Sequence, residues 1–186
     1  VHPDEKIRDF GNEADSKIQN LALEIFKDQD LYKKFKEIQT SNLDEESKTF
    51  YKDLEIDFKD AGHGLSDEKK DRLTEIEKKL IDLSISFSEN IAKDKTEVLF
   101  LEDELNGLSQ NELKNLRKNN DSFVITMAYP DINAVMENCS VRTTREIVWK
   151  AFNNRAVKEN SPILEEAVLL RNEKALLFGF KTWAEY

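Results

Sequence analysis

The chain has 186 residues and a formal net charge of −10, with 35% charged and 39% hydrophobic residues. This acidic balance argues against nucleic-acid binding, because a phosphate backbone needs a basic protein face. No apolar run approaches the roughly 20 residues that cross a bilayer. Five glycines and three prolines leave little turn chemistry for a many-stranded β protein. The composition therefore predicts a soluble, mostly α protein.

The first residues, 1–5, contain neither the basic nor the apolar segment of a secretory signal. Cys139 is the single cysteine, so the chain forms no internal disulfide, and a reducing, cytoplasmic location is expected. We interpret its thiol as a small core residue rather than a nucleophile. His2 lies at the terminus and His63 lies between two glycines, so neither has an evident way to act as its base.

Three helices are expected in the first 60 residues. Asp4 is a suitable N-cap for the first, whose apolar residues recur every three or four positions on one face. They are Ile7, Phe10, Ala14, Ile18, Leu21 and Ile25. After residues 28–30 the pattern restarts, which predicts a bend or a second helix. The next helix is predicted over 44–60 on a stripe of Phe50, Leu54 and Phe58, and it ends at Gly62 and Gly64.

The clearest helix begins after Ser66, a good N-cap that is followed by acidic residues suited to the positive end of the helix dipole. Its apolar residues recur at nearly heptad spacing. They are Leu73, Ile76, Leu80, Leu83, Phe87 and Ile91. Two interpretations fit this stripe: packing against antiparallel neighbouring helices, or a free coiled coil.

The middle of the chain predicts a small two-stranded β ribbon on a helical body. Residues 96–101 and 122–127 are short, apolar and partly β-branched, as strands are. Between them, residues 109–118 resemble a short capped helix with Leu113 and Leu116 turned inward. The expected architecture is a mostly α, multi-helix antiparallel bundle that forms one unit over residues 1–186.

Three further helices are expected in the last third. Pro130 suits a first helical turn, and Thr143 begins the next helix, with Ile147, Val148, Ala151 and Phe152 toward the core. The pair Ser161-Pro162 predicts the start of the final long helix. Gly179 is placed as its C-terminal cap.

The sequence contains no motif for catalysis, cofactor binding or metal binding. A zinc-peptidase helix needs two histidines one turn apart with a glutamate beside them, and no such pattern occurs. We therefore expect no catalytic, cofactor-binding or metal-ligating residue in these positions. The acidic clusters 44–46 and 102–104 are interpreted as helix starts or solvated surface, and His63 as a solvated loop residue.

Four arginines lie in the otherwise apolar last third. They are Arg142, Arg145, Arg155 and Arg171. Arginine in such a place commonly pairs with carboxylates or caps carbonyls between helices. The functional alternative is recognition of a peptide's C-terminal carboxylate, and the structural interpretation is favoured.

The same region carries a family resemblance, in an ordered set of spaced residues. The set contains Tyr129-Pro130, Arg142-x-x-Arg145, Ala151-Phe152, Arg155, Glu159-Asn160, Leu170-Arg171, Ala175, Leu177-Phe178-Gly179-Phe180 and Trp183-Ala184-x-Tyr186. Earlier segments agree in order, among them Pro3-Asp4-x-x-Ile7, Leu31-Tyr32 and Gly64-Leu65. The whole resembles the region upstream of the catalytic core in the thimet oligopeptidase and neurolysin family of zinc peptidases, although that family more often has Leu-Gly-Tyr at positions 178–180.

The resemblance implies a parent enzyme that is a zinc-dependent metalloendopeptidase acting on short peptides. It implies that this chain is a non-catalytic part of the N-terminal lobe, which restricts access to the substrate channel, and that its partner is the catalytic domain of the same polypeptide. Zinc would bind to the parent and not to this chain, which alone should be inactive. A cytoplasmic or mitochondrial parent and an apolar exposed face on the last helix are also expected. The alternative is a self-sufficient helical or coiled-coil interaction module without enzymatic activity.

Overall fold

The computed structural model describes residues 4–186. Its helices account for 71% of the chain and are accompanied by a small antiparallel sheet, which confirms the mostly α prediction. The chain's internal contacts form two compact units: the part up to Ser88 together with Pro162–Tyr186, and the part Glu89–Ser161. The expectation of one continuous unit stays a prediction.

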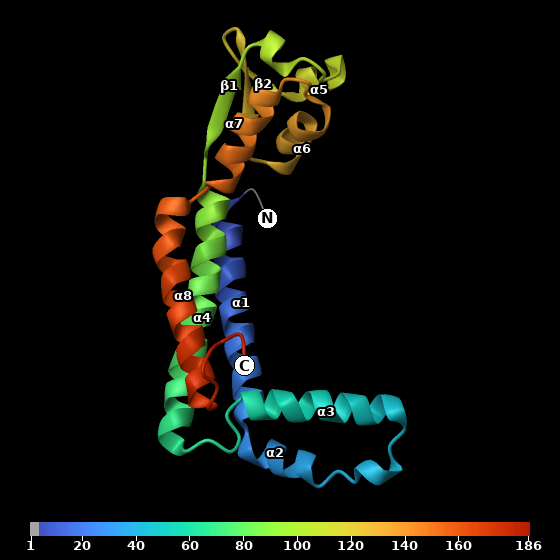
Figure 1. The fold of residues 1–186 in the computed structure, drawn as a ribbon, viewed down its shortest axis with the longest axis vertical. Helices are drawn as coiled ribbons and strands as arrows, with labels where there is room; N and C mark the ends of the chain where they lie inside the picture. Colours follow the sequence, from blue (N-terminus) through green and yellow to red (C-terminus); the bar gives the residue numbers. More distant parts are fainter. Residues whose placement is uncertain (1–3) are drawn as a thin grey trace. The chain divides into compact units, whose positions relative to one another are not determined.

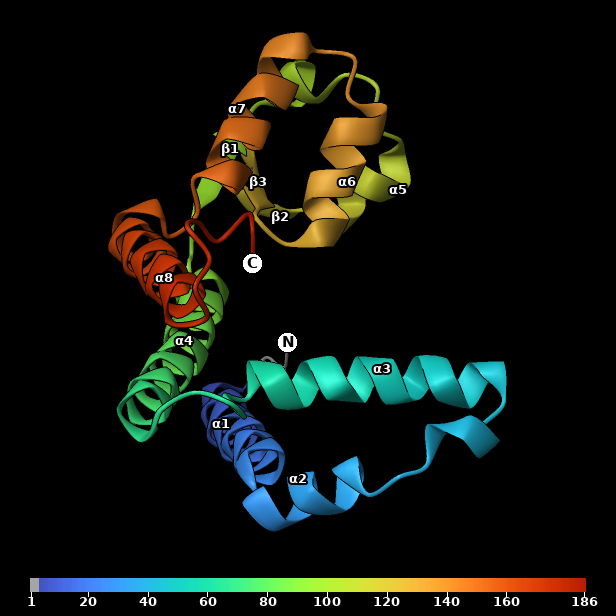
Figure 2. The same ribbon diagram turned by 60° about the horizontal axis from the view of Figure 1, so that its bottom comes forward.

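The first unit is built on a layer of three helices: α1 (Glu5–Lys27), α4 (Asp67–Lys93) and α8 (Val157–Leu177). They lie side by side, and α4 runs antiparallel to the other two (Figures 1 and 2). The middle helix, α4, buries the first part of the stripe predicted for it, because Leu73 and Ile76 are both 0% exposed. That part of the stripe therefore packs inside the layer.

The stripe predicted on α1 lies on the opposite, outward side of its helix. Phe10 is 74% exposed and Ile18 is 66% exposed, whereas the side toward α4 carries Asn12 and Ser16. Asp4 caps this helix as predicted, since its carboxylate accepts from the Lys6 N–H at 2.9 Å. The start and the periodicity were predictable, but the buried side was not.

The chain from Asp28 to Ala61 leaves α1 and returns toward it. Asp28 ends α1 and caps α2 (Gln29–Lys36), so the second-helix alternative is the correct one. A 3₁₀ turn (η1, Thr40–Asn42) and α3 (Glu45–Asp60) follow. Of the predicted α3 stripe, Phe58 is buried but Phe50 is 63% exposed, so the expectation of one packed stripe is only partly right.

The second unit contains a three-stranded sheet, which corrects the predicted two-stranded ribbon. β1 (Glu97–Phe100) and β3 (Ser122–Thr126) pair antiparallel as expected, but β2 (Arg117–Asn119) adds to the other edge of β3. The helix predicted over 109–118 is shorter in the structure, because α5 (Gln110–Asn115) ends before β2 begins. All three residues of β2 are polar and exposed, so no apolar alternation marked them as a strand.

Three more helical segments contribute side chains to the core of the second unit, together with the sheet. They are η2 (Glu102–Leu105), α6 (Tyr129–Asn138) and α7 (Arg142–Asn153). Pro130 occupies the first turn of α6 as predicted. On α7, Val148 is fully buried, but Ile147 is 45% exposed, so the prediction that Ile147 points toward the core is wrong.

The last helix, α8, begins at Val157, earlier than the predicted Ser161-Pro162 start. A residue outside the helix fixes where it begins, because the Asp94 carboxylate accepts a hydrogen bond from the Ala156 N–H at 2.9 Å. Pro162 then lies inside the helix. Gly179 has a φ of 88°, and the bond from the Phe180 N–H to the Ala175 carbonyl (3.0 Å) completes the predicted glycine cap.

Candidate functional site

Within residues 4–186, no three His, Cys, Asp or Glu side chains group in a way that could hold a metal ion. His2 lies outside the described residues. In the described part of the chain, no helix is long and apolar enough to cross a membrane. A candidate site must therefore be sought among individual side chains and hollows.

His63 is only 8% exposed, so its interpretation as a solvated loop residue is wrong. Its Nε2 lies 2.8 Å from the Phe26 carbonyl oxygen, and its Nδ1 lies 3.3 Å from the Gln29 side-chain amide. Because a carbonyl only accepts, Nε2 is the protonated nitrogen. The ring also stacks on Tyr32 at 4.0 Å. Both nitrogens are engaged in holding α1, α2 and the loop after α3 together.

Cys139 and the acidic clusters have structural positions. Cys139 is 3% exposed and belongs to the core of the second unit, as expected for a small core residue. Asp44 caps α3 by accepting from the Ser47 N–H at 2.7 Å. This bond holds the pKa of Asp44 below its ordinary value. Glu104 accepts from the Leu101 N–H at the start of η2. The prediction of helix starts is confirmed for both clusters.

The four arginines occupy three kinds of position. Arg145 donates to the Cys139 carbonyl, and Arg155 donates to the Phe152 carbonyl at 2.9 Å while covering the Phe152 ring. These two match the predicted capping of carbonyls. Arg142 is exposed on α7. Arg171 differs from the other three because it lines a hollow of the first unit.

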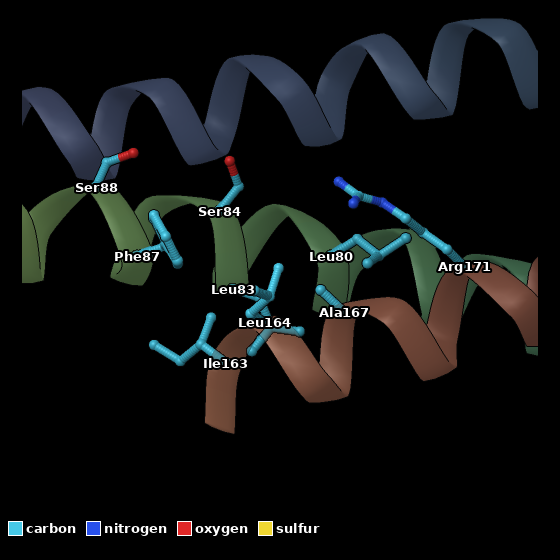
Figure 3. A pocket seen from close by; sticks show the side chains of 9 residues that line it. All are labelled: Leu80, Leu83, Ser84, Phe87, Ser88, Ile163, Leu164, Ala167 and Arg171. Carbon is cyan, nitrogen blue, oxygen red and sulfur yellow. The ribbon is translucent and has the colours of Figure 1, made fainter. Parts of the chain in front are cut away.

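That hollow is a groove of about 230 Å³ between α4 and α8. Figure 3 shows the lining side chains. They are Leu80, Leu83, Ser84, Phe87 and Ser88 of α4 and Ile163, Leu164, Ala167 and Arg171 of α8. Residues three or four apart share a helix face, and each helix contributes such a series. The apolar members form the floor between the two antiparallel helices.

The polar groups of this groove are few and placed at its margins. Arg171 is the one charged residue in its lining, and Ser84 and Ser88 supply hydroxyls along α4 (Figure 3). The Arg171 guanidinium carbon lies 6.0 Å from the centroid of the Trp183 ring. An apolar floor with a cation at one end can bind a chain that is apolar and ends in an anion.

Near the groove, a buried ionic cluster joins all three helices of the layer. The Glu77 carboxylate is 2.9 Å from Lys27 of α1 and 2.9 Å from Lys174 of α8. Lys27 also donates to the Thr74 hydroxyl at 2.9 Å. The Tyr186 ring lies beside this cluster, and its pKa is raised above the ordinary value of 10.0 by burial and by the carboxylates of Asp60 and Glu77. The two ammoniums face different oxygens of the Glu77 carboxylate, and Lys174 donates a hydrogen bond to one of them, so the buried carboxylate is paired with opposite charge.

Sequence reasoning identified Arg171 but not the groove that it lines. The signal was present in two places. The last helix has an apolar surface too wide for one neighbour, and Ser84 and Ser88 interrupt the apolar surface beside the α4 stripe. The combination required knowledge that α4 and α8 lie side by side.

Comparison with known proteins shows similarity along the whole chain. A thimet-like oligopeptidase of Dictyostelium discoideum is 35% identical over 98% of this chain. Saccharolysin of Saccharomyces cerevisiae is 31% identical over 100% of it, and oligopeptidase A of Haemophilus influenzae is 34% identical over 69%. No family model matches the chain.

These matches confirm the resemblance to the thimet oligopeptidase family that the spaced residues predicted. Two of these similar proteins carry the name oligopeptidase, so the chain is related to peptidases. The chain spans only 29%, 28% and 21% of the lengths of these three relatives, respectively. The activity of a whole protein of this kind is therefore a matter for proposal.

Proposed function

We propose that this chain is a non-catalytic part of a zinc-dependent oligopeptidase that hydrolyses short peptides. The observation that carries the proposal is the match to peptidases over 98–100% of the chain but less than a third of their length. The described residues do not fit a zinc site, so zinc is proposed for the parent protein. No catalytic step is assigned to this chain.

Its proposed role is to form a wall of the lobe that restricts access to the substrate channel, with the catalytic domain of the same polypeptide as its partner. Large apolar surfaces support this role, since contiguous ones mark interfaces. On α8, Leu169 is 71% exposed and Leu176 is 54% exposed, as expected for the last helix, and the α1 stripe is exposed as well. A cytoplasmic location is proposed for the parent.

The test compares this chain with a polypeptide extended to the length of the relatives. The 186-residue chain should cleave no fluorescence-quenched peptide and retain no stoichiometric zinc. The extended protein should cleave the peptide and lose that activity to a chelator, because its metal would activate the attacking water. Chelator-sensitive cleavage by a clean preparation of the 186-residue chain would contradict the proposal.

One observation favours a second function, that of a self-sufficient helical interaction module. The apolar stripe of α1 is exposed along its length. The α4 stripe, which suggested a coiled coil, gives this function less support because Leu73, Ile76 and Leu83 of the stripe are buried. Sedimentation combined with X-ray scattering separates the two functions, since an extended parallel dimer in solution would favour the module.

A further inference from the structure

The side of α8 that lines the groove continues past it into a part that the chain itself covers. Residues 164, 167, 171 and 175 recur at helical spacing and lie along this side of α8. Ala175 is 0% exposed, and its carbonyl accepts from the Phe180 N–H. At the other end of the same side, Leu164 is 52% exposed. The helix side is thus covered at one end and open at the other.

The covering segment, residues 178–186, shows what kind of chain packs there. Its rings contact one another, with Phe178 and Trp183 at 5.4 and 5.1 Å from Tyr186. The Lys174 ammonium lies 5.8 Å from the Tyr186 ring. A short apolar peptide segment beside a cation therefore already occupies the closed part of this helix side.

Arg171 stands at the junction of the closed and open parts. It approaches Trp183 on one side and lines the open groove on the other. Among the described residues 4–186, no carboxylate forms an ion pair with Arg171, whereas Arg72 on α4 pairs with Glu173 at 2.6 Å. A guanidinium presents five donors in a planar fork that matches a carboxylate. Its donors are available to an anionic ligand.

We propose that the groove binds the carboxyl end of a short apolar peptide. The terminal carboxylate lies against the Arg171 guanidinium, and the last side chains lie on the floor made by Leu80, Leu83 and Phe87 (Figure 3). The volume of about 230 Å³ is below the ~300–1,000 Å³ of sites for drug-sized ligands, so it suits a peptide end. The choice of a peptide rests on the proposed function of the parent.

The serines distinguish a peptide from a simple fatty acid with the same carboxylate and apolar chain. The hydroxyls of Ser84 and Ser88 lie along the α4 margin, where they can exchange hydrogen bonds with a peptide backbone. An alkyl chain offers no partner to these hydroxyls. A fatty acid should therefore bind more weakly than a peptide of similar apolar area.

Trp183 provides the readout, because it neighbours Arg171. For this measurement, Trp149 of the full 186-residue chain is replaced by Phe, which leaves Trp183 as the sole tryptophan. It is titrated with N-acetyl-Ala-Leu-Leu bearing a free carboxylate, with the matching C-terminal amide, and with octanoate. We expect saturable binding of the acid, and at least tenfold weaker binding of the amide and of octanoate. No saturable binding, or equal affinity for acid and amide, would overturn the proposal, and equal binding of octanoate would overturn the peptide assignment.

Two substitutions test the geometry. Arg171→Gln should weaken binding of the acid at least tenfold and abolish its advantage over the amide, while Arg171→Lys should give an intermediate affinity because it keeps the charge and loses the fork. The control Arg142→Gln removes an exposed arginine on α7 and should leave binding unchanged. Ala167→Phe should fill the groove and remove binding of both peptides. An unchanged affinity in Arg171→Gln, or retained binding in Ala167→Phe, would refute the site.

The outcome is independent of catalysis, since binding is measured on this chain without cleavage. A cleaving extended protein whose groove binds no peptide would overturn this inference alone. A chain that binds the acid peptide, while the extended protein cleaves nothing, would keep the site and overturn the peptidase proposal.

Discussion

Helices α1 and α4 carry the same kind of apolar stripe but use it in opposite ways. On α4, Leu73 and Ile76 are 0% exposed, while on α1, Leu21 is 56% exposed and Ile25 is 48% exposed. Both helices are long and both stripes follow helical spacing. Amphipathic periodicity therefore identifies a face of a helix, but it does not say whether this part of the chain buries that face.

The rotation of α1 is set by contacts near its end. Lys27 pairs with Glu77, and the Phe26 ring packs 5.4 Å from Phe58. With about 100° between successive residues, Ile25 lies roughly 200° around the helix from Lys27. The ion pair turns the apolar stripe away from α4. Contacts between residues far apart in the sequence thus set the orientation of this helix.

The largest effect should come from breaking that ion pair. Glu77→Gln leaves two partly buried ammoniums, Lys27 and Lys174, without their carboxylate. Loss of one partner from a buried ionic pair costs about 3–5 kcal/mol, and we expect the free energy of unfolding in urea, followed by circular dichroism, to fall by that amount.

The matched control is Glu166→Gln. Its pair with Lys79 is 3.5 Å long and about half exposed on each side, so the loss should stay below about 1 kcal/mol. Equal losses for the two variants would mean that the Glu77 cluster is not buried, and that something else orients α1.

The next effect compares the two stripes directly with one type of substitution. Leu73→Ala on α4 removes a fully buried side chain, which costs about 2–5 kcal/mol. Leu21→Ala on α1 removes an exposed one and should change the free energy of unfolding by no more than about 0.5 kcal/mol. Both positions are helical, so helix propensity cancels in the comparison. A large, concentration-dependent loss from Leu21→Ala would show instead that a second molecule covers the α1 stripe.

The sequence predicted what depends on neighbouring residues and missed what depends on distant ones. Caps at Asp4 and Gly179 and the α4 stripe follow from local spacing, and they occur as predicted. The early start of α8 depends on Asp94, a residue distant in the sequence. Strand β2 is held by pairing with β3 rather than by its own residues.

The candidate site divides in the same way. The absence of a zinc motif and the presence of Arg171 were visible in the sequence. The groove was not, because it exists only where α4 lies beside α8. His63 was misjudged because flanking glycines indicate a turn but do not say what packs on it. Its partners Phe26 and Gln29 come from α1 and α2.

The smallest effect concerns the exposed ion pair between α4 and α8, and it depends on pH. Hydrogen bonds from Arg72 hold the pKa of Glu173 below its ordinary value of 4.5. A carboxylate with a lowered pKa in the folded state stabilises the protein above its unfolded value and ceases to do so as the pH falls through the lowered one.

Glu173→Gln should therefore lower the thermal midpoint slightly near pH 7, and the difference from the unsubstituted chain should vanish below the lowered pKa. Because the pair is exposed and screened by salt, its effect should be a fraction of that of Glu77→Gln and should shrink further in high salt. A difference that persists undiminished in acid would assign the role of Glu173 to packing rather than charge. The contact between α4 and α8 would then be stabilised mainly by burial of side-chain surface, as the α4 stripe is, rather than by the ion pair.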